Sequence, residues 1–236
     1  MRASRESQPL RCALAFMCGM LSALIACFAL IVANSDGKSQ SVEQPKTVFA
    51  VNDATCKPIP SGTYMPLYLQ DDVQWSHVDY AGGTIGDSGC GLVCASMAIK
   101  YLTTQDVTPM SLADAVGDAC LTDGVSDAGK LAQWIAATYE EYGIEYSGKI
   151  YDFRLSIDQI EGGAVCLAGV RGAFGDSFYG SHIVLIWKPG NGDSWFVRDP
   201  ASPGNSSRPW TIEELTAADI FYSACIKGGH YGSTGN

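Results

Sequence analysis

The sequence is short of histidine and of positive charge. Its 236 residues include three histidines, His77, His182 and His230, so a mechanism that needs a histidine has few places to find one. Lysine and arginine number 15 against 25 aspartates and glutamates, which gives a formal net charge of −10. Because nucleic acids and anionic lipid head groups are also negative, this balance argues against either of them as a partner.

The spacing of a metal site is also missing. Nine cysteines are present, of which three lie in an N-terminal apolar run. The other six are Cys56, Cys90, Cys94, Cys120, Cys166 and Cys225. Cys90 and Cys94 have no histidine cluster nearby, so we expect no metal and no cofactor. If Cys90 is a free thiol, the remaining five cannot all pair, and the disulfide pattern stays open.

Two short motifs resemble known sites without predicting them. Residues 124–130 have the spacing of a phosphate-binding loop, but Leu131 stands where such a loop needs Ser or Thr to bind magnesium. We expect no strand before this segment and interpret it as a turn that leads into a helix, so no nucleotide is predicted. Asn205-Ser206-Ser207 fits a glycosylation sequon, but a match this short occurs by chance.

Only one long apolar run is present, from residue 12 to residue 33, and three arginines precede it. About 20 apolar residues span a bilayer, whereas the core of a cleavable signal has about 7 to 15, so the length favours a retained single-pass anchor in the cell membrane. Basic residues before the run predict that the following domain lies outside the cytoplasm. Two alternatives stay open: cleavage near Ala33, which would give a secreted protein, and lipidation at Cys27. An exported single domain of this kind is typical of a bacterial surface protein.

The chain is predicted to have four parts. Residues 1–33 form the signal anchor or signal peptide, and residues 34–62, which are polar and contain three prolines, form an extracytoplasmic linker. The folded domain is predicted over residues 63–229. Residues 230–236 are expected to be a flexible tail.

Within this domain, helical patterns come first and strand patterns later. A helix that is apolar nearly all round is predicted from Cys90 to Leu102, with Asp87 or Ser88 as its cap. Further helices are predicted over 109–116 and from about residue 127 to Gly143, with capping boxes at 156–159 and 211–214. Strands are predicted over 144–150, 164–170, 182–187, 195–199 and 220–226. This segregation indicates an α+β fold, with N-terminal helices packed on an antiparallel sheet.

Cys90 is the candidate nucleophile. A thiolate is favoured at a helix N-terminus and beside a histidine, and Cys90 is expected to begin a helix. We expect Gly89 and Gly91 to leave room for a substrate backbone, and the N–H of Cys90 to point where an oxyanion would form. The other cysteines of the domain are interpreted as core residues.

His182 is the candidate base. His230 lies in the predicted tail and His77 in a predicted loop, whereas His182 is expected to open a strand and so to have a fixed direction. If the hairpin that follows is symmetric about Gly190 and Asn191, His182 faces Asp199. Opposed side chains in an antiparallel pair have Cβ atoms about 4.5 to 5.5 Å apart, close enough for a carboxylate to orient the imidazole.

These residues belong to a wider pattern that resembles a known family. The pattern comprises Gln70-Asp71, Trp75, Tyr80, Gly86-Asp87-Ser88-Gly89-Cys90-Gly91, Thr108-Pro109, His182 and Asp199-Pro200. It is similar to the double-glycine leader peptidases, also called bacteriocin-processing peptidases, over roughly residues 68–226. The resemblance implies a papain-like cysteine peptidase fold in which Gln70 supplies an oxyanion-hole amide. It also implies that Cys90 is the nucleophile, His182 the general base and acid, and Asp199 the residue that orients His182.

The sequence departs from this family at Leu92 and Ile183, where relatives often have a small residue or proline and an aromatic residue. It also lacks the ATPase and multi-span region of the transporter-linked members, so a double-glycine leader is not implied as its substrate. The predicted function is that of an extracytoplasmic thiol-dependent peptidase that acts on a peptide or protein. A cell-wall amidase or transpeptidase with the same triad, or a catalytically silent surface binding module, stays open.

Overall fold

The computed structural model describes residues 64–190 and 192–228. All of them belong to one compact unit. The predicted anchor, linker and tail lie outside the described residues, and the four predicted parts of the chain stay predictions. Within the described ranges, no helix has both the length and the apolar character to cross a bilayer.

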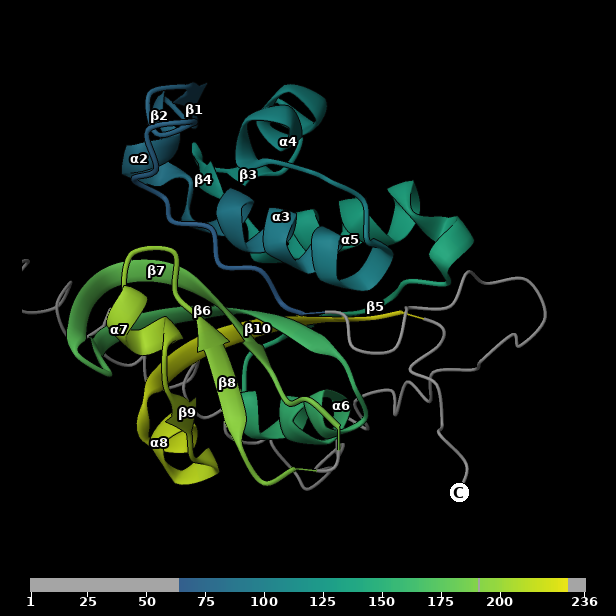
Figure 1. Ribbon diagram of the computed structural model, residues 1–236, viewed down its shortest axis with the longest axis vertical. Helices are drawn as coiled ribbons and strands as arrows, with labels where there is room; N and C mark the ends of the chain where they lie inside the picture. The colour runs from purple at the N-terminus through teal and green to yellow at the C-terminus, as the bar shows by residue number, and fades with distance from the viewer. Residues whose placement is uncertain (1–63, 191, 229–236) are drawn as a thin grey trace, which may run out of the picture. The chain divides into compact units, whose positions relative to one another are not determined.

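The first half of the described chain is mainly helical (Figure 1). Two small hairpins flank its helices, and the longest helix, α3, covers Cys90–Thr103. The elements in chain order are β1 (Asp79–Tyr80), β2 (Gly83–Thr84), α2 (Ile85–Ser88), α3, α4 (Pro109–Val116), β3 (Leu121–Thr122), β4 (Val125–Ser126), α5 (Ala128–Thr138) and the 3-10 turn η1 (Glu140–Tyr142).

The second half forms a six-stranded sheet in the order β5-β10-β6-β7-β8-β9, and every neighbouring pair is antiparallel. Its strands are β5 (Glu145–Ile150), β6 (Val165–Phe174), β7 (Ser177–Trp187), β8 (Trp195–Arg198), β9 (Pro209–Trp210) and β10 (Asp219–Lys227). The short helices of this half are η2 (Phe153–Ser156), α6 (Ile157–Glu161), α7 (Pro203–Ser206) and α8 (Ile212–Ala217). The predicted α+β class with an antiparallel sheet is confirmed.

A separate apolar core lies on each face of this sheet. Along β6, Val165 and Leu167 belong to the core shared with α3 and α5, whereas Cys166 and Ala168 belong to the core on the opposite face. This alternation follows from the two-residue repeat of a strand. On the first face α3 contacts β7 and α5 contacts β10 (Figure 1). The helical layer and the central strands therefore fix each other's positions.

Helix α3 is buried nearly all round, as its apolar sequence predicts, but its cap differs from the prediction. Gly89 precedes α3 and makes no side-chain cap. Asp87 instead completes a capping box with Thr84 at the start of the preceding helix, α2. A short helix immediately before α3 therefore occupies both residues that were expected to cap it.

The other predicted helix boundaries have mixed outcomes. Thr108 and Thr211 cap α4 and α8, as predicted. Ser156 is not a cap, because it already has helical backbone angles at the end of η2, and its hydroxyl bonds to that of Ser223 at 2.5 Å. Gly143 ends η1 in a left-handed conformation rather than α5, which stops at Thr138.

The hairpin between β7 and β8 has a different register from the one predicted. Trp187 pairs with Phe196, whereas a turn symmetric about Gly190 and Asn191 would place it opposite Ser194. A shift of two residues leaves every side chain on the same face of the sheet, so the hydrophobic pattern cannot distinguish the two registers. His182 also does not open its strand, because β7 begins at Ser177 and pairs with β6 from its first residue.

Candidate active site

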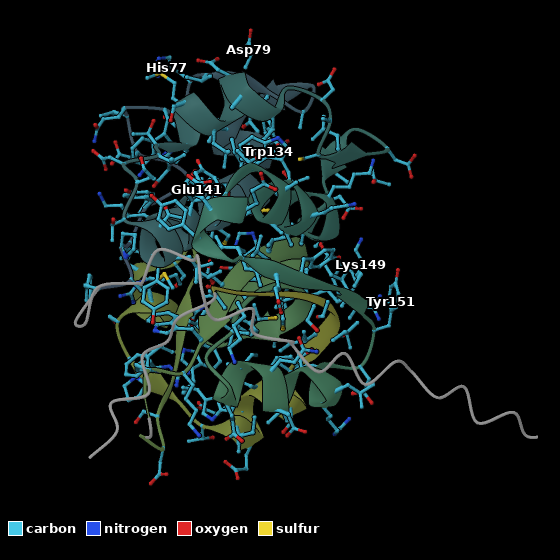
Figure 2. The ribbon with its side chains drawn as sticks, turned by 90° about the vertical axis from the view of Figure 1, so that its right-hand side faces the viewer. His77, Asp79, Trp134, Glu141, Lys149 and Tyr151 are labelled. Carbon is cyan, nitrogen blue, oxygen red and sulfur yellow. The ribbon has the colours of Figure 1, made fainter. Side chains whose placement is uncertain are left out.

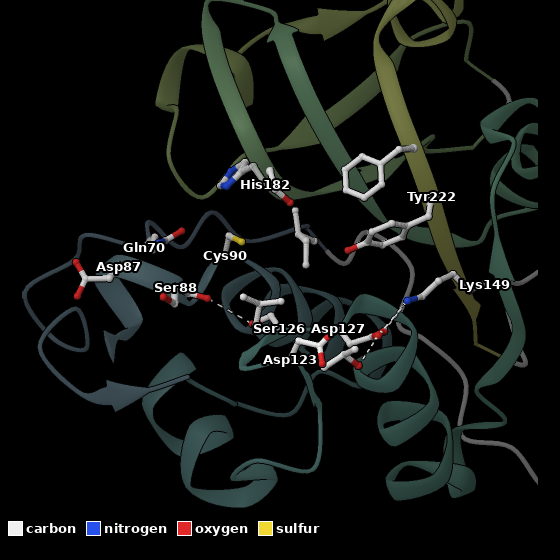
Figure 3. Close-up of a pocket in the computed structure, with 15 residues that line it drawn as sticks. Gln70, Asp87, Ser88, Cys90, Asp123, Ser126, Asp127, Lys149, His182 and Tyr222 are labelled. Carbon is white, nitrogen blue, oxygen red and sulfur yellow. Dashed lines mark hydrogen bonds and ion pairs between the residues drawn. The ribbon is translucent and has the colours of Figure 1, made fainter. Parts of the chain in front are cut away.

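Cys90 lies at the first position of α3, partly exposed, in a cleft of about 420 Å³ that Gln70 and His182 also line. In the close-up, His182 projects from the sheet above Cys90, and Gln70 lies beside Cys90 (Figure 3). The cleft therefore brings together three of the four predicted site residues.

The two glycines beside Cys90 contribute differently from the prediction. A methyl group at Gly91 would lie 2.8 Å from the side chains of Ile183 and Ser126, and one at Gly89 would lie 2.6 Å from the carbonyl oxygen of Ile85. These distances are shorter than any normal carbon contact. The expectation that the glycines leave room for a substrate is wrong: they allow the start of α3 to pack closely against the protein's own residues.

His182 and Asp199 are in direct contact. The imidazole Nε2 lies 2.9 Å from Oδ1 of Asp199, and both side chains are buried. The contact forms although the register differs, because Asp199 follows the last residue of β8 and lies diagonally across from His182 rather than opposite it. With Nε2 bonded to Asp199, Nδ1 is the ring nitrogen that the carboxylate leaves unoccupied.

The surroundings of His182 favour its protonated form. Burial alone would lower the pKa of His182, because it disfavours the charged imidazolium. The hydrogen bond to Asp199 and the interaction with the Cys90 thiol outweigh this effect and raise that pKa to about 9. At neutral pH the imidazole therefore carries a positive charge next to the thiol.

Asp199 is held by donors on both of its oxygens. Oδ1 receives the His182 ring and the backbone N–H of Ala201 at 3.0 Å. Oδ2 accepts the hydroxyl of Tyr179 at 2.8 Å and the amide of Asn205 at 2.9 Å. Burial alone would raise the pKa of Asp199, but the hydrogen bonds from His182, Asn205 and Tyr179 hold it below its usual range. The buried carboxylate is thus kept ionised beside the imidazole.

Two hydrogen bonds hold Gln70 in place, one from its side chain and one from its backbone. Its Nε2 donates to the carbonyl of Gly86 at 2.7 Å, just before the nucleophile, and its backbone N–H donates to the carbonyl of Pro200 at 2.8 Å. Its Oε1 is buried and has no hydrogen-bond partner among the described residues. The residue after Asp199 therefore helps to place Gln70, so the two predicted site residues are structurally linked.

A buried arginine holds the segment that leads to Gln70. The Arg198 guanidinium donates to the carbonyls of Met65, Pro66 and Ser206, and to the hydroxyl of Tyr64. It precedes Asp199, so one stretch of chain orients the imidazole and also secures the 64–70 segment. Nothing in the sequence pattern singles out this arginine.

Sequence reasoning missed Tyr179 and Asn205. Asn205 was considered only within a glycosylation sequon, but it is 1% exposed and its amide is bonded to Asp199 and to the carbonyl of Phe174. It is therefore inaccessible to a glycosyl group in the folded chain. Tyr179 lies 20 positions before Asp199 and has no periodic relation to it. No local sequence signal could have found either residue.

The remaining candidates lie away from this chemistry. His77 is exposed and lies near Asp79 at one end of the helical part (Figure 2). Over residues 64–190 and 192–228 no group of three or more side chains could hold a metal ion, and the five cysteines in these ranges are free thiols.

The segment with phosphate-loop spacing begins in the turn between β3 and β4, includes β4, and ends at the start of α5, which Asp127 caps. This confirms the interpretation as a turn that leads into a helix, but the short strand β3, which was not expected, precedes it.

Comparisons with known proteins give a likeness only at the level of solved structures. No protein-family model matches the chain, and neither does any curated protein. A Bacillus anthracis protein provisionally described as a C39-like peptidase is 15% identical, with a TM-score of 0.45, over 70% of this chain and 96% of the other.

The double-glycine motif protease of an AMS/PCAT transporter, solved in complex with the leader peptide, is 16% identical. Its TM-score is 0.43, over 72% of this chain and 97% of the other. Both descriptions name the kind of peptidase that the sequence resembles. At these identities and TM-scores, the roles of this chain's residues have to be derived from their own geometry.

Proposed function

We propose that the protein is a thiol-dependent peptidase, with Cys90 as nucleophile, His182 as general base and acid, and Asp199 as the residue that orients His182. One observation carries this proposal: His182, which is bonded to the buried Asp199, lines the same cleft as a cysteine at the first position of a helix. A helix N-terminus and an adjacent imidazolium both stabilise a thiolate.

The first half of the reaction forms an acyl-enzyme. With the Cys90 proton held on Nδ1 of His182, the sulfur attacks the carbonyl carbon of the scissile peptide bond. The negative charge that develops on the carbonyl oxygen is stabilised by the N–H of Cys90 and by the second N–H of the Gln70 amide, whose first N–H is bonded to Gly86. His182 then protonates the departing amine as the carbon–nitrogen bond breaks.

The second half releases the acid. His182 takes a proton from a water molecule, the resulting hydroxide attacks the thioester carbon, and the carbon–sulfur bond breaks to restore the thiol. A cell-wall amidase or a transpeptidase would use the same first half. A transpeptidase would replace the water with an amine.

We place this activity outside the cytoplasm, because of the long apolar run and the arginines before it.

The proposal is tested by alkylation of the native protein with iodoacetamide across pH, with each modified cysteine mapped by mass spectrometry. Accessibility alone favours Cys90, because the other four described cysteines are buried. The deciding comparison is therefore His182→Ala, which leaves Cys90 exposed but removes the imidazolium. We expect at least a tenfold loss of Cys90 alkylation at pH 6.5 in this variant. Equal rates in the two proteins would rule out the catalytic pair and leave a silent binding module as the working hypothesis.

A further inference from the structure

Tyr179 contacts both members of the His182–Asp199 pair. Its hydroxyl donates to Oδ2 of Asp199 at 2.8 Å, and its ring stacks on the imidazole with 4.2 Å between centroids and 22° between planes. It is only half-buried. A tyrosine that only filled core space would need neither contact.

A bulge in β7 makes this double contact possible. Residues three apart on a regular strand point to opposite faces, so Tyr179 and His182 would normally diverge. Here His182 pairs with Val170 and Tyr179 pairs with Gly172, so two residues of β7 oppose a single residue of β6. The extra residue returns Tyr179 to the side of His182. Bulges often redirect side chains beside active sites in this way.

The Tyr179 hydroxyl also completes the set of donors around the carboxylate. Oδ1 carries two donors, and Oδ2 has Tyr179 and Asn205. If the hydroxyl were removed, Asn205 alone would hold Oδ2, and the carboxylate could turn so that Oδ1 moves away from the imidazole. Asn205 itself is fixed through the carbonyl of Phe174 and the backbone N–H of Asp176.

We propose that Tyr179 is a positioning residue of the thiol site: its hydroxyl keeps Asp199 turned toward His182, and its ring holds the imidazole in the plane that presents Nδ1 to Cys90. This role rests on the proposed function, since it assigns Tyr179 a part in the proton transfer. Tyr179 itself gains and loses no proton in the reaction.

The test is an NMR titration of the histidine ring protons in the full chain, carried out in a Cys90→Ala background so that the thiol does not contribute. The signal of His182 is assigned by its loss in His182→Ala. The ionisable groups that face the ring are then Asp199 and the Tyr179 hydroxyl, and Asp176 is the next charge near Tyr179. Tyr179→Phe keeps the stacked ring and removes only the hydroxyl.

In Tyr179→Phe we expect the pKa of His182 to fall by at least one unit relative to the parent, because the carboxylate no longer stays in place. The matched control is Tyr142→Phe, which removes another tyrosine hydroxyl, one that accepts from Gln105 at 2.8 Å in the helical part. It should leave the titration of His182 unchanged. An unchanged or raised pKa in Tyr179→Phe would overturn the proposal, even if that variant unfolds more easily.

A parallel alkylation of Cys90 separates this inference from the proposed function. With the thiol present, Tyr179→Phe should slow alkylation at pH 6.5 by about fivefold to tenfold, and Tyr142→Phe should not. If alkylation depends on His182 but neither its rate nor the titration responds to Tyr179→Phe, only the positioning role fails. If the titration shifts but alkylation does not depend on His182, the positioning role stands and the peptidase proposal fails.

Discussion

Gly91 shows how closely α3 approaches β7 at the scale of a single residue. In an ordinary helix, replacing glycine by alanine stabilises the fold by about 1 kcal/mol. Here the added methyl group would meet Ile183 and Ser126 at 2.8 Å, and overpacking of this kind costs about 1 to 3 kcal/mol. We therefore predict that Gly91→Ala lowers the free energy of unfolding in urea and slows Cys90 alkylation, because the start of α3 moves away from His182.

The matched control for this change is Gly192→Ala. Gly192 lies between β7 and β8, outside the bulge, and the methyl group that it would gain meets only the carbonyl oxygen of Pro189, at 3.8 Å. Both measurements should remain close to wild type in this variant. If Gly91→Ala is as stable as wild type or more stable, the close packing of α3 against β7 does not require a glycine.

Residue chemistry explains why the sequence could predict some site residues and not others. Cys90 stood out because it lies between two glycines at the start of a predicted helix. His182 stood out because the chain has only three histidines from which to choose a base. Asp199 was found through an incorrect register that was displaced by two residues. Tyr179 and Asn205 reach Asp199 only through a bulge in β7 and through the fold of α7, neither of which has a recognisable sequence signal.

At the scale of elements, Arg198 links the segment that carries Gln70 to the end of β8. Its planar guanidinium reaches the carbonyls of Met65, Pro66 and Ser206 together, which the single ammonium of lysine cannot do. We predict that Arg198→Lys lowers the free energy of unfolding by about 2 kcal/mol, because buried acceptors lose charged donors. Hydrogen exchange at the backbone N–H of Gln70, which donates to the carbonyl of Pro200, should become faster.

Arg208→Lys serves as the comparison for that variant. Arg208 forms a partly exposed ion pair with Glu214 at 2.9 Å, and such pairs contribute about 0 to 1 kcal/mol. Its replacement should leave the exchange of Gln70 unchanged. Equal effects of the two substitutions on that amide would show that Arg198 does not anchor the 64–70 segment.

Local signals account for the elements that were predicted correctly. Threonines with helix-capping geometry marked α4 and α8, and the uniformly apolar α3 stood out as a core helix. The failures at Ser156 and Asp87 have one cause: each residue is already part of a short helical turn that local pattern does not reveal.

At the scale of the whole molecule, the order of the patterns along the chain, with helices first and strands later, was enough to predict an α+β fold with an antiparallel sheet. The alternation along β6 and β7 explains why one sheet can support two cores. The course of the chain between these elements, which brings the end of β8 next to residues 64–70, depends on long-range contacts such as those of Arg198. The local pattern of a single sequence gives no access to such contacts.

The pH dependence of global stability provides a test of the His182–Asp199 pair. A histidine whose pKa is raised in the folded state, here from 6.5 to about 9, stabilises the fold fully below about pH 6.5 and loses that contribution as the pH rises through about 9. Its size is about 3 kcal/mol, since one pKa unit corresponds to about 1.4 kcal/mol. Between pH 6.5 and 9.5, the free energy of unfolding should therefore fall further in wild type than in Asp199→Asn, by up to about 3 kcal/mol, since Cys90 also contributes to the raised pKa of His182.

The comparison of the two proteins is essential, because buried thiols also reduce stability in this range. The pKa of Cys94 and that of Cys166 are raised by burial, so each thiol stays protonated in the folded chain while it ionises in the unfolded chain. Asp199 is only the last of the causes that raise the pKa of Cys94, after burial and Cys90, so this contribution is nearly the same in wild type and in Asp199→Asn and largely cancels in the difference. Urea unfolding at several pH values gives both curves, and measurements end at pH 9.5, below the pKa of about 10 of an unfolded tyrosine, so that tyrosine ionisation stays a minor contribution. Parallel curves would mean that Asp199 does not hold the proton on His182, and the orienting role assigned to it would be lost.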